Sequence, residues 1–233
     1  MNIKSILFLS IILIALNAGA QSTGDFSISF TGNMEGIRIT GYTGSARAIT
    51  IPADIEGIPV KEIGNNAFAN RNITSVVIPG SVTIIGENAF SGSRQLTSVI
   101  MHDNIVQIGD FAFRGTGITQ IDLPSKITII NRGLFFECTS LTSIVIPEGV
   151  TIIGMDAFNT CSALTSITLP STIISIRNSA FLNCGALTTV LIPDSVASIE
   201  FNGNPFVGCS RLSLVSQANL RRRGWDPNVR NVR

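Results

Sequence analysis

The chain has few side chains that could carry chemistry, and the first candidate is its single histidine. His102 is followed by Asp103, and Asp110 lies a short distance further along the chain. A histidine beside carboxylates can serve as a general base or as a metal ligand. Either role needs an oriented partner and a pocket, and the sequence indicates neither. We therefore favour a solvent-exposed substitution at His102 over a base or ligand, and we predict that the protein is not an enzyme.

Four cysteines are the second candidate, and their spacing argues against a metal site. Cys138, Cys161, Cys184 and Cys209 are separated by 23, 23 and 25 residues, and no C-x-x-C pair occurs. Structural zinc sites usually place two cysteines within a few residues of each other, so no metal site is predicted. In an exported protein, four cysteines can instead form two disulfides. Because they fall at one recurring position, we favour a stacked, buried column of reduced thiols.

The third candidate is a run of positive charge near the end of the chain. Residues 211–233 contain six arginines, three of them consecutive at 221–223, and a single acid, Asp226. Such a cluster could contact an anionic lipid, glycan or polymer, but we favour a solvated tail. The sequence has no G-x-x-x-x-G-K-[ST] loop, and no G-x-G-x-x-G motif at a strand-to-helix turn. We therefore predict no cofactor and no nucleic-acid partner.

A recurring block of 22 or 23 residues explains the even spacing of these cysteines. Two segments have nearly the same pattern of residue types: 141–161 (LTSIVIPEGVTIIGMDAFNTC) and 164–184 (LTSITLPSTIISIRNSAFLNC). One phenylalanine marks each copy: Phe68, Phe90, Phe113, Phe135, Phe158, Phe181 and Phe206. A block of this length cannot bury its own apolar face, so the copies must stack on one another. We expect these phenylalanines to form one internal column.

Each block contains the signals of three short elements. The L-x-x-I-x-I segment at 141–146 places three apolar side chains on one side, as a strand of a parallel sheet would. A second apolar pair, Val150 and Ile153, is typical of another short strand, and the step Ala157-Phe158 suggests a short helical turn. The predicted fold is a mainly β repeat solenoid. It has a parallel sheet on its concave face, with short second strands and short helical turns elsewhere.

The two ends of the chain depart from the repeat. Residues 1–20 combine a basic start, an apolar run and small residues before position 21, which predicts a signal peptide cleaved after Ala20; an uncleaved anchor helix is the alternative. Residues 21–50 alternate apolar and polar side chains and predict an N-terminal β-hairpin cap. About seven repeats follow in residues 51–212. Residues 213–233 form the predicted C-terminal cap and basic tail, with helical turns at 217–223 and Trp225 folded back as a lid.

The string A-F-x-x-C-x-x-L-T-S-I-x-I-P resembles the BspA-type leucine-rich repeat family of bacterial surface and secreted proteins. The resemblance covers roughly residues 50–212, and the copies within 133–212 match best. Two copies depart locally, with Met101-His102 in place of Ile-Pro and Gly133-Leu134 in place of the alanine step. The family implies a surface or secreted protein that binds a partner or mediates adhesion. It carries no catalytic residues that could be transferred to this chain.

The outward-facing strand positions form the predicted binding surface. Alternation along each strand defines three outward files, the first of which is made of threonines. The second file includes Ser98, Gln120, Ser143 and Ser166. The third file contains Val77, Ile100, Asp122, Val145, Thr168 and Leu191. An exposed apolar stripe often marks an interaction site, but β-branched residues also simply favour strands, and both interpretations stay open.

These features predict an exported binding module that meets a protein or glycan through its sheet. A structural, self-assembling envelope component is the alternative. The mature chain is expected to lack a membrane span, and the signal peptide directs it to the periplasm, the cell surface or the medium.

Overall fold

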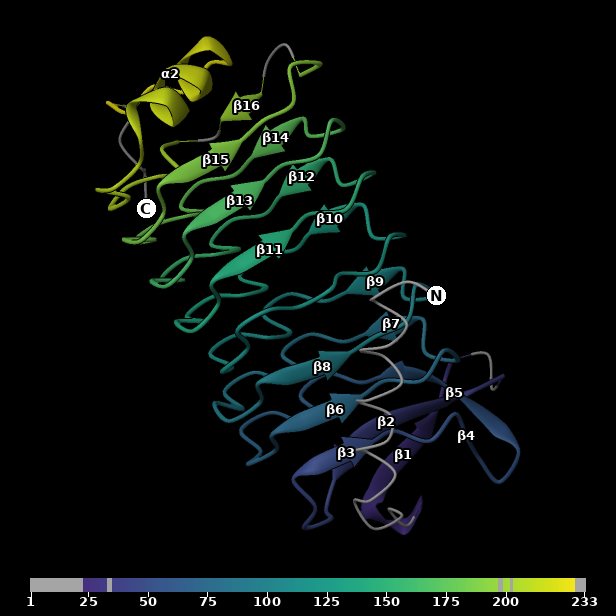
Figure 1. Cartoon of the computed structure of the whole chain (residues 1–233). Helices are drawn as coiled ribbons and strands as arrows, with labels where there is room; N and C mark the ends of the chain where they lie inside the picture. Colours follow the sequence, from purple (N-terminus) through teal and green to yellow (C-terminus); the bar gives the residue numbers. More distant parts are fainter. Residues whose placement is uncertain (1–22, 33–34, 197–198, 202, 229–233) are drawn as a thin grey trace, which may run out of the picture.

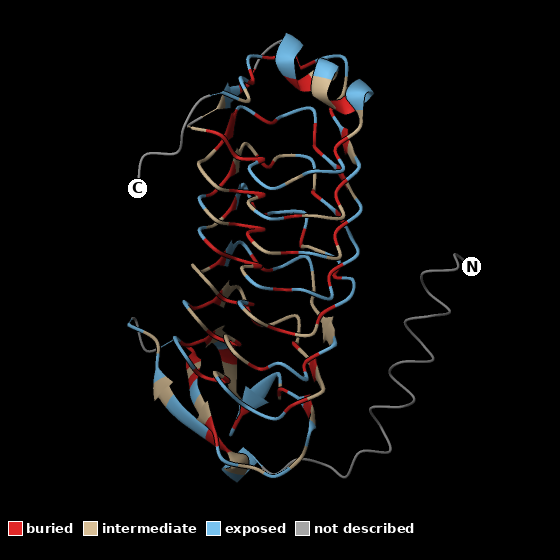
Figure 2. Ribbon diagram, turned by 90° about the vertical axis from the view of Figure 1, so that its left-hand side faces the viewer, coloured by how far each residue is buried: buried red, intermediate tan, exposed pale blue. Residues whose placement is uncertain are grey.

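The computed structural model describes residues 23–32, 35–196, 199–201 and 203–228. The predicted signal peptide, residues 1–20, lies outside this part of the chain. Stacked coils form a tall column with the N-terminal strands at one end and a helix at the other (Figures 1 and 2). Buried residues recur at the same positions of successive coils, so the core is continuous along the column (Figure 2). The predicted fold class, a parallel β solenoid with little helix, is confirmed.

A column of phenylalanine rings runs through the centre of the coils. The seven rings from Phe68 to Phe206 stack one on the next, with centroids between 5.1 and 5.9 Å apart. Neighbouring planes differ by at most 18°. The prediction that like side chains lie over like is confirmed. Each ring fills the interior of its coil and supplies a flat surface for the next coil.

Short parallel strands line two faces of the column. One face carries β3 (Ala48–Thr50), β6 (Ser75–Val77), β8 (Ser98–Ile100), β11 (Ser143–Val145), β13 (Ser166–Thr168) and β15 (Thr189–Leu191). The other carries β5 (Ile58–Ile63), β7 (Ile84–Ile85), β9 (Gln107–Ile108), β10 (Ile129–Ile130), β12 (Ile152–Ile153), β14 (Ser175–Ile176) and β16 (Glu200–Phe201). Pairing is in register between equivalent residues, as in Ile144↔Ile167 and Ile153↔Ile176. Each predicted pair of strand segments is therefore present in most coils.

Both sheets are interrupted at one level of the column. On the first face, β8 and β11 belong to separate three-stranded sheets, and the intervening copy has no strand at residues 118–122. On the second face, the pairing ends at β9 and begins again at β10. The gap between β8 and β11 is visible in Figure 1. The chain is one residue shorter between Phe113 and this copy, and the preceding copy contains the Met101-His102 departure directly after β8.

The third side of each coil is a run of turns, not a helix. In most coils the residues two before and two after the phenylalanine have positive φ angles; around Phe158 these are Asp156 (58°) and Thr160 (61°). The reason lies in the backbone hydrogen bonds. The Phe158 N–H donates to the carbonyl of Ala180 in the next coil at 2.7 Å, whereas an α-helix would use that N–H within its own segment. The predicted short helical turn is therefore absent. Residues with a left-handed backbone conformation take its place and direct alternate N–H groups toward the neighbouring coil.

The N-terminal end is covered by an antiparallel hairpin. After the 3-10 turn η1 (Thr23–Asp25), β1 (Phe26–Phe30) pairs with β2 (Ile37–Tyr42). Strand β2 then pairs in parallel with β5, and β4 (Asp54–Ile55) forms a small antiparallel pair with β5. The rings of Phe26 and Tyr42 extend the aromatic column beyond Phe68. The hairpin therefore buries Ile37, Ile39 and Tyr42 of β2, whereas Ile28 and Phe30 of β1 are exposed.

The C-terminal end is covered by a helix and a tryptophan. Helix α2 (Leu214–Arg222) begins earlier than the predicted segment 217–223, because the Ser213 side chain caps it by accepting a hydrogen bond from the Ser216 N–H at 3.2 Å. The Trp225 ring then packs edge-on against Phe206 with centroids 5.6 Å apart. Its indole N–H donates to Asn204 Oδ1 at 3.1 Å. The aromatic column therefore ends under a buried indole.

Among the residues that the structure describes, no helix is both long and apolar enough to cross a bilayer.

Candidate interaction surface

The threonine file on the first face holds the coils together. The hydroxyls of Thr142 and Thr165 donate to the backbone carbonyls one coil earlier, those of Thr119 and Thr142, both at 3.2 Å. The same bond recurs from Thr97 to Thr74 and from Thr188 to Thr165. Because these hydroxyls already have partners within the column, the file is explained by stacking and contributes little specificity for a ligand.

The third file is apolar and exposed only in part of the column. Val145 is 72% exposed and Leu191 is 53% exposed, and Thr168 lies between them in register. Val77 and Ile100 pair on β6 and β8 but are half-buried. The predicted continuous stripe across six coils is therefore divided into two patches by the interruption of the sheet.

The copy with Asp122 and Gln120 separates these two patches. Both residues are exposed and lie outside any strand, so they place polar side chains between the patches of β8 and β11. In the second file, Ser98 pairs in register with Ser75, and Ser143 with Ser166. The surface that the structure presents as one unit is accordingly the β11–β13–β15 sheet.

The cysteines form the predicted column of free thiols. Each thiol donates to the carbonyl of the phenylalanine in the preceding coil: Cys138 to Phe113 at 3.0 Å, and Cys161 to Phe135 at 3.1 Å. Ser93 occupies the same position two coils earlier and donates to the Phe68 carbonyl at 2.7 Å. The recurring requirement is thus a small side chain that donates one hydrogen bond between coils, and a thiol or a hydroxyl meets it.

Burial makes these thiols resistant to ionisation. Desolvation raises the pKa of Cys138 to about 11, and it raises the pKa of Cys161 well above the ordinary value. The pKa of Cys184 is also raised, first by its hydrogen bond with Cys209 and then by burial. A thiolate is the reactive form of cysteine, so these groups are suited to packing and not to nucleophilic or redox chemistry.

We expect the Cys138 thiol to make the fold less stable in alkali. Between pH 9 and pH 11 the thiol ionises in the unfolded chain but stays neutral in the folded one, so the free energy of unfolding falls by up to about 3 kcal/mol. Cys138→Ser should lose this component because a hydroxyl does not titrate there. Urea unfolding at pH 8, 9, 10 and 11 measures it. An identical alkaline decline in both proteins would contradict the assignment.

The structure places His102 in no recognisable catalytic arrangement. His102 and Asp110 are both half-buried, so the histidine that was expected to be solvent-exposed is only partly exposed. Asp103 is engaged elsewhere, since its Oδ1 accepts a hydrogen bond from the Ser125 N–H at 3.0 Å in the next coil. Across the described part of the chain, no group of three or more His, Cys, Asp or Glu side chains is arranged to hold a metal ion.

The consecutive arginines separate into two roles. Arg223 is buried and fastens the C-terminal cap, because its guanidinium donates to the carbonyls of Val196 and Pro193 at 3.0 and 3.2 Å. Arg221 and Arg222 are exposed, and Arg221 lies over the Trp225 ring. The prediction of a solvated tail is therefore wrong for Arg223, whose guanidinium is buried and hydrogen-bonded within the C-terminal cap.

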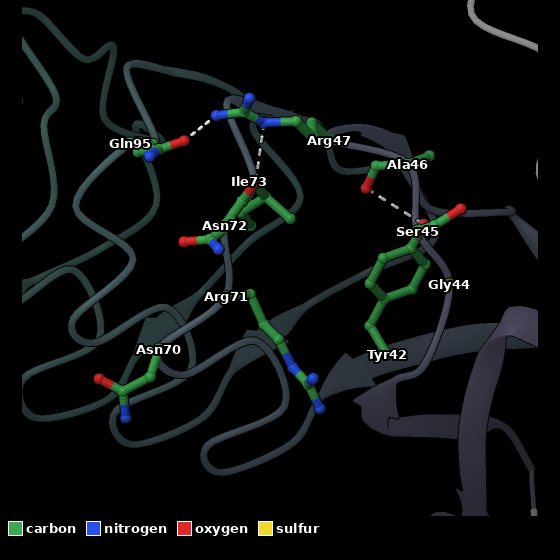
Figure 3. A pocket seen from close by; sticks show the side chains of 10 residues that line it. All are labelled: Tyr42, Gly44, Ser45, Ala46, Arg47, Asn70, Arg71, Asn72, Ile73 and Gln95. Carbon is green, nitrogen blue, oxygen red and sulfur yellow. Dashed lines mark hydrogen bonds between the residues drawn. The ribbon is translucent and has the colours of Figure 1, made fainter.

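A polar pocket of about 450 Å³ lies where the N-terminal cap meets the first coil. Its walls are the loop after β2 and the tight turn between Phe68 and β6 (Figure 3). Figure 3 shows Arg47 reaching toward Gln95, whereas the Arg71 side chain extends away from Arg47. This pocket was not predicted from the sequence. One feature of the sequence could have indicated it: Arg71 occupies the position that cysteine or serine fills in other coils.

Comparison with known proteins decides the family. The family model described as "BspA type Leucine rich repeat region (6 copies)" matches residues 61–161 and 128–221, which together cover more than half of the chain. The chain belongs to the BspA-type leucine-rich repeat family. The resemblance predicted from the repeat pattern is therefore confirmed. BspA-type repeats typically build non-enzymatic scaffolds for protein interaction.

Solved structures of bacterial leucine-rich repeat proteins share the fold. A leucine-rich repeat protein of T. pallidum is 31% identical, with a TM-score of 0.84, and the match covers 88% of this chain and 96% of that one. A leucine-rich cell surface protein of Faecalibacterium prausnitzii is 33% identical, with a TM-score of 0.69, over 83% of this chain and 53% of its own. A third, from Eubacterium ventriosum, is 25% identical, with a TM-score of 0.66, over 80% and 51%. This chain therefore spans about half the length of the last two proteins.

No curated protein sequence matches this chain significantly.

Proposed function

We propose that this protein is an exported binding module that engages a protein partner through the β11–β13–β15 sheet. One observation carries the proposal: Val145 and Leu191 expose large apolar side chains on a face whose neighbouring hydroxyl groups are already bonded between coils. Such apolar groups favour a partner that removes them from water. Export through the signal peptide of residues 1–20 is part of the same proposal, and the similarity to a leucine-rich cell surface protein of Faecalibacterium prausnitzii supports it.

The rigid column suits this task. The strands that present Val145 and Leu191 are fixed by stacked rings beneath them and by hydrogen bonds between coils on both sides. A preformed surface loses little conformational freedom when it binds, so more of the contact energy appears as affinity. Val145 and Leu191 lie two strands apart, about 10 Å, a distance that one partner element can span.

We expect Val145→Lys and Leu191→Lys each to weaken binding at least about tenfold. Each substitution removes an apolar anchor whose burial is worth roughly 1.5–3 kcal/mol, and it places a charge in the contact. The measurement is binding of the mature protein to immobilised host-matrix proteins and to whole cells. Ile174→Lys makes the same change at an exposed position on the opposite face and should leave binding intact. Unchanged binding by both sheet variants would reject this surface.

The self-assembly alternative is weakened by the covered ends of the column. Hairpin β1–β2 lies over the first coil, and α2 with Trp225 lies over the last, so neither end offers a bare coil to another copy. Light scattering on the samples used for binding separates the two functions. A monomer that binds supports the module, whereas concentration-dependent growth that the Lys substitutions abolish supports assembly.

A further inference from the structure

The polar pocket at the N-terminal end owes its existence to a local change in the coil. In most later coils, the residue three after the phenylalanine is a small donor that bonds to the preceding coil, as Ser93 does to Phe68. In the first coil this residue is Arg71, and the place of the preceding phenylalanine is taken by Tyr42. The Arg71 side chain is therefore exposed and lines the pocket, while its backbone N–H donates to Ser93 Oγ at 3.0 Å.

Two guanidinium groups line this pocket without a carboxylate. Arg47 Nε donates to the Asn72 carbonyl at 3.2 Å, and a second nitrogen of Arg47 donates to the Gln95 side chain, so both of its acceptors are neutral. Within the described residues, the Arg71 guanidinium has no hydrogen-bond or ion-pair partner. None of the ten lining residues is acidic. Arginine is the side chain best shaped to hold a carboxylate through two parallel hydrogen bonds.

The other residues that line the pocket are better suited to bind hydroxyl groups of a ligand than its apolar groups. Asn70, Gln95 and Ser45 offer amide and hydroxyl groups, each able to donate and accept. The two bulky apolar members, Ile73 and Tyr42, are only 2% exposed and offer no apolar subsite. The volume falls within the range of roughly 300–1,000 Å³ that is usual for ligand pockets. This lining suits a hydroxyl-rich anion better than a peptide with apolar side chains.

The wall of the pocket is also held in shape before any ligand arrives. The Tyr42 hydroxyl donates to the Ala46 carbonyl at 3.3 Å across the loop. Gly44 lies so close to this ring that a Cβ there would be 2.5 Å from the tyrosine oxygen. The loop is thus wrapped around a buried tyrosine, which fixes where Arg47 leaves the backbone.

We propose that this pocket binds a carboxylated saccharide, with the Arg71 guanidinium pairing with the carboxylate, Arg47 adding a second positive charge, and the neighbouring amides bonding to ring hydroxyls. This site is separate from the β11–β13–β15 sheet and does not depend on the function assigned to that sheet. It gives the protein a second recognition surface at the opposite end of the column from α2.

The test is titration of the mature protein with trigalacturonic acid, with its methyl ester as a neutral ligand of the same backbone. We expect saturable binding of the acid and at least about tenfold weaker binding of the ester, because the charge-assisted bonds are lost. Arg71→Gln should weaken binding of the acid about tenfold or more, and its thermal unfolding should match the parent because the side chain has no partner to lose. Arg94→Gln, an exposed arginine outside the pocket, should bind as the parent does.

Three results would overturn the proposal. The first is no saturable binding of trigalacturonic acid, and the second is equal binding of this acid by the parent and by Arg71→Gln. The third is equally tight binding of a tetraglutamate peptide, which would show that the pocket recognises negative charge alone. Val145→Lys distinguishes this site from the sheet. It should retain the saccharide and lose the protein partner, whereas Arg71→Gln should do the reverse.

Discussion

Replacing Phe158 by alanine should lower the free energy of unfolding by about 3–5 kcal/mol. The ring is fully buried and stacked between Phe135 and Phe181, with centroids 5.5 and 5.2 Å away. Removing it leaves a cavity in the middle of the column and deprives two neighbouring rings of a contact surface. In a solenoid, stability depends on the interfaces between neighbouring coils, and this substitution damages two of them at once.

Urea unfolding monitored by circular dichroism measures the effect of Phe158→Ala. Phe30→Ala is the matched control, because the Phe30 ring is exposed on β1 and lies outside the stacked column. We expect the control to stay within about 0.5 kcal/mol of the parent. If Phe158→Ala cost no more than the control, the aromatic column would not be the main support of the coils.

Trp225→Ala should release the C-terminal cap, with a local loss of about 3–5 kcal/mol. The buried indole closes the ring column over Phe206 and donates to Asn204 Oδ1. Without it, the last coil presents an uncovered apolar face to water, and the damage should spread from that end because each coil contacts only its neighbours.

Hydrogen exchange locates the damage caused by Trp225→Ala. Exchange should accelerate in β16 and α2 and stay unchanged in β6 and β8, which lie far along the column. Val215→Ala is the control on the same helix, since Val215 is 80% exposed and makes no packing contribution of this size. Uniform acceleration along the whole chain would show that the column unfolds as one unit and that the cap has no local role.

Much of the fold was predictable because its repeat is regular. Phenylalanines spaced 22–25 residues apart can meet only if the coils stack, and the ring column follows from that spacing. The reduced cysteines were predictable for a similar reason, since Cys161 and Cys184 occupy one register of neighbouring coils. The outward threonines were placed correctly, but their hydrogen bonds to the preceding coil could not be inferred from β propensity.

The exposed face of the first sheet was predicted less completely. The alternation that identified Val145 and Leu191 as outward also predicted a continuous stripe through Asp122, because alternation does not report whether a strand keeps its pairing. One residue fewer after Phe113 was visible in the sequence. The same shortening after Phe68 leaves β6 intact, so the absence of a strand at 118–122 depends on how that coil fits against its two neighbours.

By itself, the sequence determined the period, the inward side chains and hence the stacking, because burial of a repeated apolar pattern has essentially one solution. Tertiary structure decided what depends on contacts between coils. Left-handed residues such as Asp156 replace a helical turn because the Phe158 N–H bonds to the next coil. The Arg47–Arg71 pocket forms because the cap brings together segments more than twenty residues apart. Neither feature could be inferred from one repeat, since each arises only where two elements meet.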